Sequence, residues 1–273
     1  MNKCIDLSET NKLVEMRYGW MVYNINDSFI GKSISHYGEW SQIEVEFFKT
    51  VLSPKDNVIE VGSNIGSHTL PISKFVNAGN VFAFEPQEII YQNLCANLSL
   101  NSLTNCFCFK TALTEKKGEE LYFLNLDFSK PQNFGAHKII REKLDNSIKS
   151  NVDTLDNIFP DLLNLRLLKI DVEGMELNVI KGGEKLIRRT SPIIYLENDR
   201  VENSKDLIDF ISSLDYRLFW HVVPLYNKNN FFKNSDNIFD NISSFNMICI
   251  KNGIPVKMNL PEIHDSSLHP LKK

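Results

Sequence analysis

The feature that most constrains the fold is one short segment in which an apolar run meets two glycines. Residues 58–66 read VIEVGSNIG, and an amphipathic stretch follows them. The apolar run predicts a buried strand, and Gly62 predicts a tight turn that a ligand can approach closely, because glycine has no Cβ. Gly66 is expected to let the following helix begin close to the strand. In open α/β sheets ligands bind outside the carboxyl ends of the strands, so this turn predicts a binding loop.

The rest of the chain alternates short apolar runs with amphipathic stretches, a pattern typical of a mostly parallel sheet covered by helices on both faces. Strands are expected at 57–61, 81–84, 106–109, 165–172 and 193–196. Helices are expected at 67–75, 87–100 and 206–214, and in a stretch that ends at Gly182. Two further strands, at 216–223 and 245–250, are joined without a helix. That connection predicts an antiparallel edge on an α/β sheet.

The first 53 residues lack the alternation of strands and helices and predict other elements. An aromatic-rich stretch at 18–23, a turn at 26–27 and the stretch 29–35 predict a β-hairpin. Ser41 and Glu44 form a capping-box pattern, which predicts a helix at 42–52. One hairpin and one helix bury too little surface to fold alone. We therefore expect residues 1–53 to pack on a single catalytic domain at 54–273.

Composition narrows the function classes. The chain has 34 acidic and 30 basic residues, a net charge of −4, which argues against a nucleic-acid partner. No apolar run approaches the roughly 18 to 20 residues of a membrane span. The start of the chain lacks the apolar core of a signal peptide. Five cysteines without a CxxC pair fit a reducing compartment, so we expect a cytoplasmic protein.

Glu85 points to a nucleoside cofactor. It ends the second predicted strand, 19 residues after Gly66, the spacing at which a carboxylate accepts hydrogen bonds from ribose hydroxyls. The glycine turn lacks the G-x-G-x-x-G spacing of dinucleotide sites and the Gly-Lys-Ser/Thr of a P-loop. A nucleoside without phosphates fits better, and S-adenosylmethionine is the common one. An NAD-dependent sugar oxidoreductase or epimerase is the alternative enzyme class.

Further carboxylates end the later strands. Asp171 and Glu173 lie on the same predicted rim as Gly62, and Glu197 ends the neighbouring strand. A hydroxyl acceptor must give its proton to a base, or be acidified by a metal. The catalytic candidates are therefore Asp171, Glu173, Glu197 and His221, which either take the proton or hold a divalent metal. The alternative for Asp171 and Glu173 is capping of the following helix.

Two other histidines lie near predicted loops. His68 comes directly after the glycine turn, and we expect it to support the site rather than to perform the chemistry. His137 belongs to the stretch 128–150, whose weak periodicity between sheet elements predicts a lid. From that lid His137 is expected to face the acceptor.

Together these segments resemble the FkbM-type family of S-adenosylmethionine-dependent methyltransferases, over about residues 37–250. The resemblance is carried by VIEVGSNIGSHT, FAFEP, VDTLD, LKIDVEGMELNVIKGG and PIIYLEND. It implies a class I methyltransferase (Rossmann-like) sheet of seven strands whose last strands are antiparallel. It also implies a cofactor site lined by Glu60, Gly62, Asn64, Gly66 and Glu85, with Asp171 beside it. The turn formed by Thr111, Ala112 and Leu113 would meet the adenine, and Glu39 would lie near the ammonium group.

Members of this family commonly methylate hydroxyl oxygens of sugars or natural products. The resemblance therefore implies O-methylation of a saccharide or of a glycosylated or polyketide-like compound. The non-enzymatic alternative is an inactive methyltransferase fold that serves as a binding module. The aromatic residues are expected to belong mostly to the core, and the alternative for Trp220, Tyr226, Phe231 and Phe232 is a wall that stacks on a sugar.

Overall fold

A central sheet of seven strands organises the structure, a computed structural model that describes residues 4–136, 139–255 and 258–272. The strand order is β13-β14-β12-β11-β4-β5-β6. The five strands from β12 to β6 are parallel, and β14 runs antiparallel to both of its neighbours. The strands are β4 (Asn57–Val61), β5 (Asn80–Phe84), β6 (Cys106–Phe109), β11 (Leu165–Ile170), β12 (Ile193–Glu197), β13 (Tyr216–Pro224) and β14 (Ser243–Lys251). The predicted parallel sheet with an antiparallel edge is confirmed.

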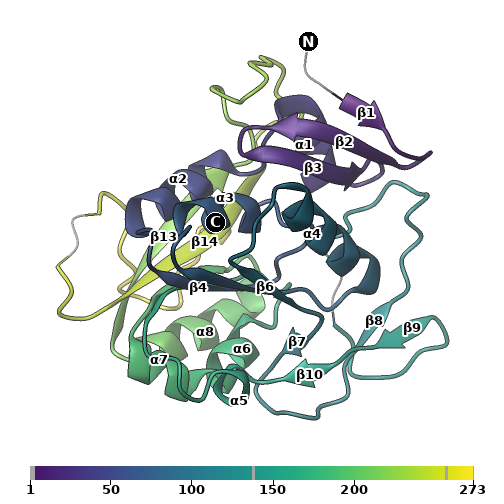
Figure 1. Ribbon diagram of the computed structural model, residues 1–273. Coiled ribbons are helices and arrows are strands. Elements are labelled where there is room, and N and C mark those ends of the chain that lie inside the picture. Colours follow the sequence, from purple (N-terminus) through teal and green to yellow (C-terminus); the bar gives the residue numbers. More distant parts are fainter. Residues whose placement is uncertain (1–3, 137–138, 256–257, 273) are drawn as a thin grey trace.

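Helices cover both faces of this sheet (Figure 1). One face carries α2 (Gln42–Val51), α3 (Thr69–Phe75) and α4 (Glu88–Leu100), and the other carries α5 (Leu155–Ile158), α6 (Glu176–Gly182), α7 (Glu184–Thr190) and α8 (Val201–Ser213). Every residue of β4 is buried as a result. Its side chains alternate between the two cores: Val58 packs with Phe48 and Ile72, whereas Ile59 packs with Val179.

The N-terminal zone differs from the prediction in one element. A hairpin forms, but its strands are β2 (Asn11–Met16) and β3 (Gly19–Asn24), with β1 (Cys4–Asp6) added to β2. The stretch 29–35, predicted as a strand, lies mostly in helix α1 (Ile30–Tyr37). A helix forms here because Ile34 and Tyr37, three residues apart, are then both buried on one face. Gly38, at a φ of 66°, then ends the helix.

Hydrogen bonds tie this zone to the sheet domain. The side-chain amide of Asn97 on α4 donates to the carbonyl of Val22 (3.1 Å), and its oxygen accepts from the N–H of Val22 (2.7 Å). Val14, Met21 and Ile34 also share a buried cluster with residues of the sheet domain, including Leu70 and Ile90. The N-terminal zone thus shares a buried cluster with the sheet domain.

We therefore predict that limited proteolysis will not release a folded N-terminal fragment. Cleavage within the loop between α2 and β4 should be slow, and any fragment of residues 1–53 should be degraded, because its apolar side chains lose their partners on α3 and α4. Mass spectrometry of a digestion time course measures this. A fragment 1–53 that persists and keeps a cooperative thermal transition would contradict the prediction.

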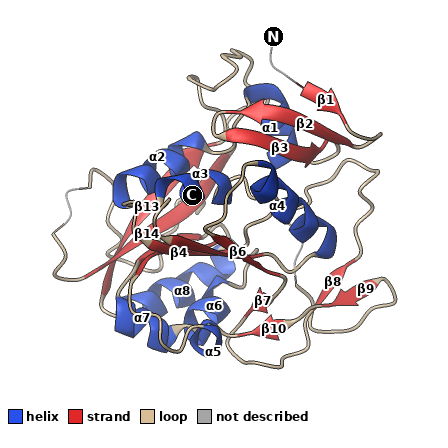
Figure 2. Ribbon diagram, viewed as in Figure 1, coloured by secondary structure: helices blue, strands red, loops and turns tan. Residues whose placement is uncertain are grey.

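The segment between β7 (Ala112–Leu113) and β10 (Val152–Asp153) leaves the central sheet. Figure 2 shows β8 (Tyr122–Leu124) and β9 (Ser147–Lys149) as a separate antiparallel pair beside it. The chain after β8 contacts the N-terminal zone, because the carbonyl of Phe128 accepts hydrogen bonds from the side-chain amides of Asn24 and Asn26, both at 3.1 Å. His137, predicted to face the acceptor, lies outside the described residues.

Candidate active site

A cavity of about 370 Å³ opens at the carboxyl ends of β4, β5, β11 and β12. Because parallel strands end at one rim, residues far apart in the sequence meet there. The lining residues from these strand ends and the helix after β4 are Glu60, Gly62, Ser63, Asn64, Ser67, His68, Glu85, Gln87, Lys169, Asp171, Glu173, Glu197, Asp199 and Arg200. Segments outside the sheet add Phe29, Ile30, Trp40, Asn133, Gly135, Ala136, Leu225 and Ile242, and the start of β14 adds Ser243 and Ser244.

The two glycines of the binding loop have different roles. Gly62 adopts a φ of 84°, and a Cβ on it would lie 1.8 Å from the carbonyl oxygen of Asp171. Gly62 therefore lets the ends of β4 and β11 approach each other as well as turning the chain. Gly66 is not among the cavity-lining residues, contrary to the implied cofactor contact. A Cβ on Gly66 would lie 2.9 Å from Leu94, so its small size serves the packing of α4.

Glu85 lies at the end of β5 and is 5% exposed. Its carboxylate accepts hydrogen bonds from the backbone N–H of Asn64 (3.1 Å) and of Gln87 (2.9 Å). Burial raises the pKa of Glu85 to about 7, although these two hydrogen bonds oppose the rise. Each carboxylate oxygen has a further lone pair available, so the group can accept hydrogen bonds from a ligand.

A second, narrower cavity adjoins the first at Glu85. It measures about 50 Å³ and shares Gly62, Asp171 and Glu173 with the larger cavity. Its walls are largely apolar, and the lining includes Val61, Phe84, Pro86, Thr111, Ala112, Leu113, Phe123, Ile139 and Val172. Thr111, Ala112 and Leu113, which the resemblance assigns to the adenine, are thus among the residues that line this cavity. A narrow apolar slot beside a carboxylate suits a flat heterocycle attached to a ribose.

Lys169 was not predicted as a site residue, but it stands at the centre of the charged part of the cavity. It is 2% exposed, and its Nζ lies 3.5 Å from Oε1 of Glu60 and 3.4 Å from Oδ2 of Asp171. The other oxygen of Glu60 accepts from the hydroxyl of Thr69 at 2.6 Å. Burial alone would lower the pKa of Lys169, but the carboxylates of Asp171, Glu60 and Glu44 together raise it. The available sequence signal was a lysine inside an apolar central strand.

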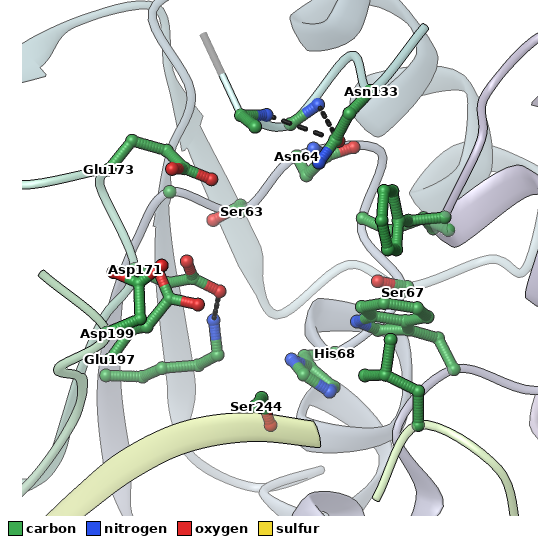
Figure 3. A pocket seen from close by; sticks show the side chains of 18 of the residues that line it. Ser63, Asn64, Ser67, His68, Asn133, Asp171, Glu173, Glu197, Asp199 and Ser244 are labelled. Carbon is green, nitrogen blue, oxygen red and sulfur yellow. Dashed lines mark hydrogen bonds and ion pairs between the residues drawn. The ribbon is translucent and has the colours of Figure 1, made fainter. Parts of the chain in front are cut away.

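Four carboxylates gather on one side of the cavity, across from Ser67 and His68 (Figure 3). They belong to Asp171, Glu173, Glu197 and Asp199. Burial, together with the neighbouring acids Asp171 and Asp199, raises the pKa of Glu197 well above its ordinary value. Oε2 of Glu197 is buried and has no hydrogen-bond partner among the described residues. In its protonated form this carboxyl can donate a hydrogen bond.

Glu173 combines an unusual backbone with a shifted pKa. Its φ is 56°, a conformation that is strained for a residue with a side chain. Its carboxylate accepts a hydrogen bond from the guanidinium of Arg200, which also lies 3.3 Å from Asp199. Burial and then the charge of Asp171 raise the pKa of Glu173 to about 7, against the opposing effect of Arg200. Neither Asp199 nor Arg200 was predicted as a site residue.

The helix-capping alternative for Asp171 and Glu173 is not what the structure shows. The N-cap residue of α6 is Met175, without a side-chain cap. The carboxylate of Glu176 instead accepts from the backbone N–H groups of Val172 (3.3 Å) and Gly174 (3.0 Å). Asp171 and Glu173 therefore remain available to face the cavity.

Two predicted site residues lie elsewhere. Glu39 is 4% exposed, and its carboxylate accepts from Arg17, from the amide of Asn227 (2.7 Å) and from the N–H of Phe231 (2.8 Å). It is not among the cavity-lining residues, so nothing in the structure supports the expectation that it meets an ammonium group. Its oxygens are satisfied by the protein instead.

His221 is likewise buried away from the cavity. Its Nδ1 lies 3.0 Å from the hydroxyl of Tyr195, and its ring packs against Phe47. Burial lowers its pKa. The predicted role of His221 as a base or metal ligand is not supported, because β13 turns this side chain toward α2 rather than toward the rim.

The candidate sugar-stacking residues are also not among the residues that line the cavity. They are Trp220, Tyr226, Phe231 and Phe232. Phe29 and Trp40 do line it. His68, expected only to support the site, is a lining residue with a buried Nε2 that has no partner among the described residues. Burial, with a smaller effect from the charge of Lys169, lowers the pKa of His68 well below its ordinary value.

Within residues 4–136, 139–255 and 258–272, no group of three or more His, Cys, Asp or Glu side chains is arranged to hold a metal ion. In the same part of the chain, no helix combines the length and the apolar character needed to cross a membrane.

Comparison with known proteins identifies the family. A profile described as the methyltransferase FkbM domain matches residues 60–218, more than half of the chain. The chain belongs to the FkbM methyltransferase family. This match contains the glycine loop, Glu85 and all four carboxylates of the acidic side.

Two curated proteins are similar to about half of this FkbM chain. Methyltransferase sdnD of Sordaria araneosa is 29% identical over 153 residues, which cover 46% of this chain and 59% of that protein. Methyltransferase 1 of Beauveria bassiana (strain ARSEF 2860) is 27% identical over 152 residues, covering 47% of this chain and 59% of that protein. The chain thus spans well under two thirds of the length of the curated relatives that it matches.

The fold of this FkbM chain is that of class I methyltransferases, as predicted. The solved structure of a precorrin-6y C5,15-methyltransferase from Geobacter metallireducens GS-15 superposes with a TM-score of 0.50 at 13% identity. It covers 77% of this chain and 88% of that one. At this identity the similarity concerns the fold alone.

Proposed function

We propose that the chain is an S-adenosylmethionine-dependent methyltransferase that methylates a hydroxyl group of a saccharide or of a glycosylated or polyketide-like natural product. The observation that carries the proposal is the position of Glu85, between the charged cavity and the apolar slot and directly beside the glycine loop. Membership of the FkbM family supports methyl transfer as the reaction.

The residues present fit an adenosyl group. The slot lined by Phe84, Leu113 and Phe123 would hold the adenine, and Glu85 would accept hydrogen bonds from the ribose hydroxyls. Asn64 and the Gly62 backbone would border the methionine part. When bound, S-adenosylmethionine supplies an electrophilic methyl group on a positively charged sulfur.

The acidic side of the cavity would handle the proton of the acceptor. Glu173, with its pKa of about 7, is ionised to a large extent at neutral pH and is a stronger base than an ordinary carboxylate. Glu197, whose pKa is raised by burial and by the neighbouring acids, would in its protonated form donate a hydrogen bond that orients the acceptor. We propose that Asp171 keeps Lys169 in place beside them. The alternative, a divalent metal held by Asp171, Glu173 and Glu197, is disfavoured because these described side chains do not form a group arranged to hold a metal ion.

The charge of the cavity also favours a small-molecule acceptor over a nucleic acid. Six carboxylates line it, and the two lining cations among the described residues are Lys169 and Arg200. A polyanion would be repelled at this rim. The same intact arrangement argues against an inactive binding module.

We predict that calorimetry will detect binding of S-adenosylmethionine or S-adenosylhomocysteine to the purified protein. Glu85→Ala should weaken that binding by about 1 to 3 kcal/mol, because the ribose hydroxyls lose their buried acceptor. Exposed Glu202→Ala on α8 is the matched control and should bind like the unchanged protein. Heat with NAD but with neither methionine compound would overturn the proposal in favour of the oxidoreductase class.

A further inference from the structure

The cavity has two halves of different chemistry and different origin. Its charged half comes from the strand ends within residues 60–218, the part that matches the family. Its apolar half comes from segments outside that match and consists of Phe29, Ile30, Trp40, Leu225 and Ile242. Since the charged half accounts for the cofactor and the proton, the apolar half is available to the acceptor.

The apolar half, called the apolar wall below, is supported by a buried cluster. Tyr37, Leu225 and Phe239 form a buried cluster against which Phe29 and Trp40 pack. The ring of Phe29 stacks on that of Phe239 at 6.1 Å with an interplanar angle of 7°. The cluster joins the N-terminal zone to the loop between β13 and β14.

Glu39, next to Trp40 in the chain, stabilises the contact between the N-terminal zone and the loop between β13 and β14. Its carboxylate binds Arg17 on one side and both Asn227 and the backbone of Phe231 on the other. The hydroxyl of Ser33 donates to the carbonyl of Glu39 at 2.8 Å. Glu39 is thus a positioning residue for the wall.

The charged half disfavours an anionic acceptor. Lys169 is already paired with Glu60 and Asp171, and Arg200 with Glu173 and Asp199. A phosphate or carboxylate on the acceptor would have to displace one of these carboxylates and lie next to the others. An uncharged group that donates hydrogen bonds suits these oxygens better.

We propose that the acceptor is an uncharged hydroxyl compound with an apolar body, which seats this body against Phe29 and Trp40 and presents its hydroxyl to the acidic side of the cavity. This inference rests on the proposed function and deepens it. Selection of the acceptor then resides in residues 29–40 and 225–242, not in the family-matched region.

Three probes test the proposal on the full-length protein saturated with S-adenosylhomocysteine. Phenyl β-D-glucopyranoside should bind about 10-fold or more tightly than methyl β-D-glucopyranoside, because it buries a phenyl ring on the wall. Glucose 6-phosphate should bind no better than the methyl glycoside. Calorimetry or the fluorescence of Trp40 provides the readout.

Variants assign the preference to the wall. Phe29→Ala and Trp40→Ala should each remove most of the preference for the phenyl glycoside while changing the affinity for S-adenosylhomocysteine by less than about 2-fold, and Trp40→Phe should restore it. Phe107→Ala, at an exposed position of β6 outside both cavities, is the control and should keep the preference.

Equal binding of the two glycosides, including no binding of either, would overturn the proposal, as would tighter binding of glucose 6-phosphate. A preference that survives in Trp40→Ala and Phe29→Ala would do the same. If S-adenosylhomocysteine itself does not bind, the proposed function fails instead, so the two failures are distinguishable.

Discussion

Glu173→Gln is expected to lower the turnover of methyl transfer by roughly 10²-fold or more, with cofactor affinity nearly intact. The amide keeps the size of the side chain and its contact with Arg200, but it cannot take a proton. Release of S-adenosylhomocysteine, measured with a hydroxyl acceptor selected by screening, gives the rate. Asp171→Asn should lower turnover to a similar extent, because it also disturbs Lys169.

The pH dependence of the same reaction provides an independent readout. The folded protein raises the pKa of Glu173 to about 7. The basic form is therefore lost as the pH falls through 7, so turnover should rise between about pH 6 and pH 8 and then level off. Glu173→Gln should lack this rise, whereas exposed Glu202→Gln should keep both the rate and the profile.

Two outcomes would contradict this role of Glu173. Normal turnover in Glu173→Gln would exclude it as the base and direct attention to His68, which is neutral and lines the cavity. Loss of activity on exhaustive chelation, restored by a divalent metal, would favour the metal alternative. Full activity after chelation is expected if Glu173 takes the proton itself.

Lys169→Met is expected to destabilise the protein by about 3 to 5 kcal/mol, the usual cost of removing one partner from a buried ion pair. The substitution leaves the carboxylates of Glu60 and Asp171 in the cavity wall without their cation. Urea unfolding at pH 7, followed by circular dichroism, measures the free energy of unfolding.

A second substitution makes this test specific. Lys169→Met combined with Glu60→Gln should recover a large part of the loss, since the buried uncompensated charge of Glu60 is then gone. Lys205→Met is the matched control, because its ion pair with Asp209 is exposed on both sides and should contribute little. If Lys169→Met alone is as stable as the unchanged protein, Lys169 and Glu60 do not form a buried charge pair in solution.

Two of the motifs that carry the resemblance also contain residues that support folding. In VDTLD, the hydroxyl of Thr154 accepts from the N–H of Asn157 and caps α5, and Asp156 accepts from the N–H groups at the start of α7. In the GG that ends α6, a Cβ on Gly182 would lie 2.0 Å from the carbonyl oxygen of Thr114. The motifs that carry the resemblance therefore include residues of the site as well as residues that serve packing.

Local sequence was sufficient where the neighbours along the chain decide the structure. Glycine at a strand end and the acid after the next strand predicted the loop and Glu85, since both depend on strands whose apolar runs are easy to read. The stretch 29–35 was predicted wrongly because its apolar spacing suits a strand or a helix, and packing against Met21 and Leu70 selected the helix.

The sequence by itself determined the rim: in a parallel sheet every strand ends on the same side, so Glu85, Asp171, Glu173 and Glu197 had to meet there. Only the tertiary structure decided their partners. The register of β11 against β4 sets Lys169 beside Glu60, and the packing of the β13–β14 loop on the N-terminal zone takes up Glu39 and brings Phe29 to the cavity. These contacts join segments about 100 to 200 residues apart, where no local pattern specifies which side chains will meet.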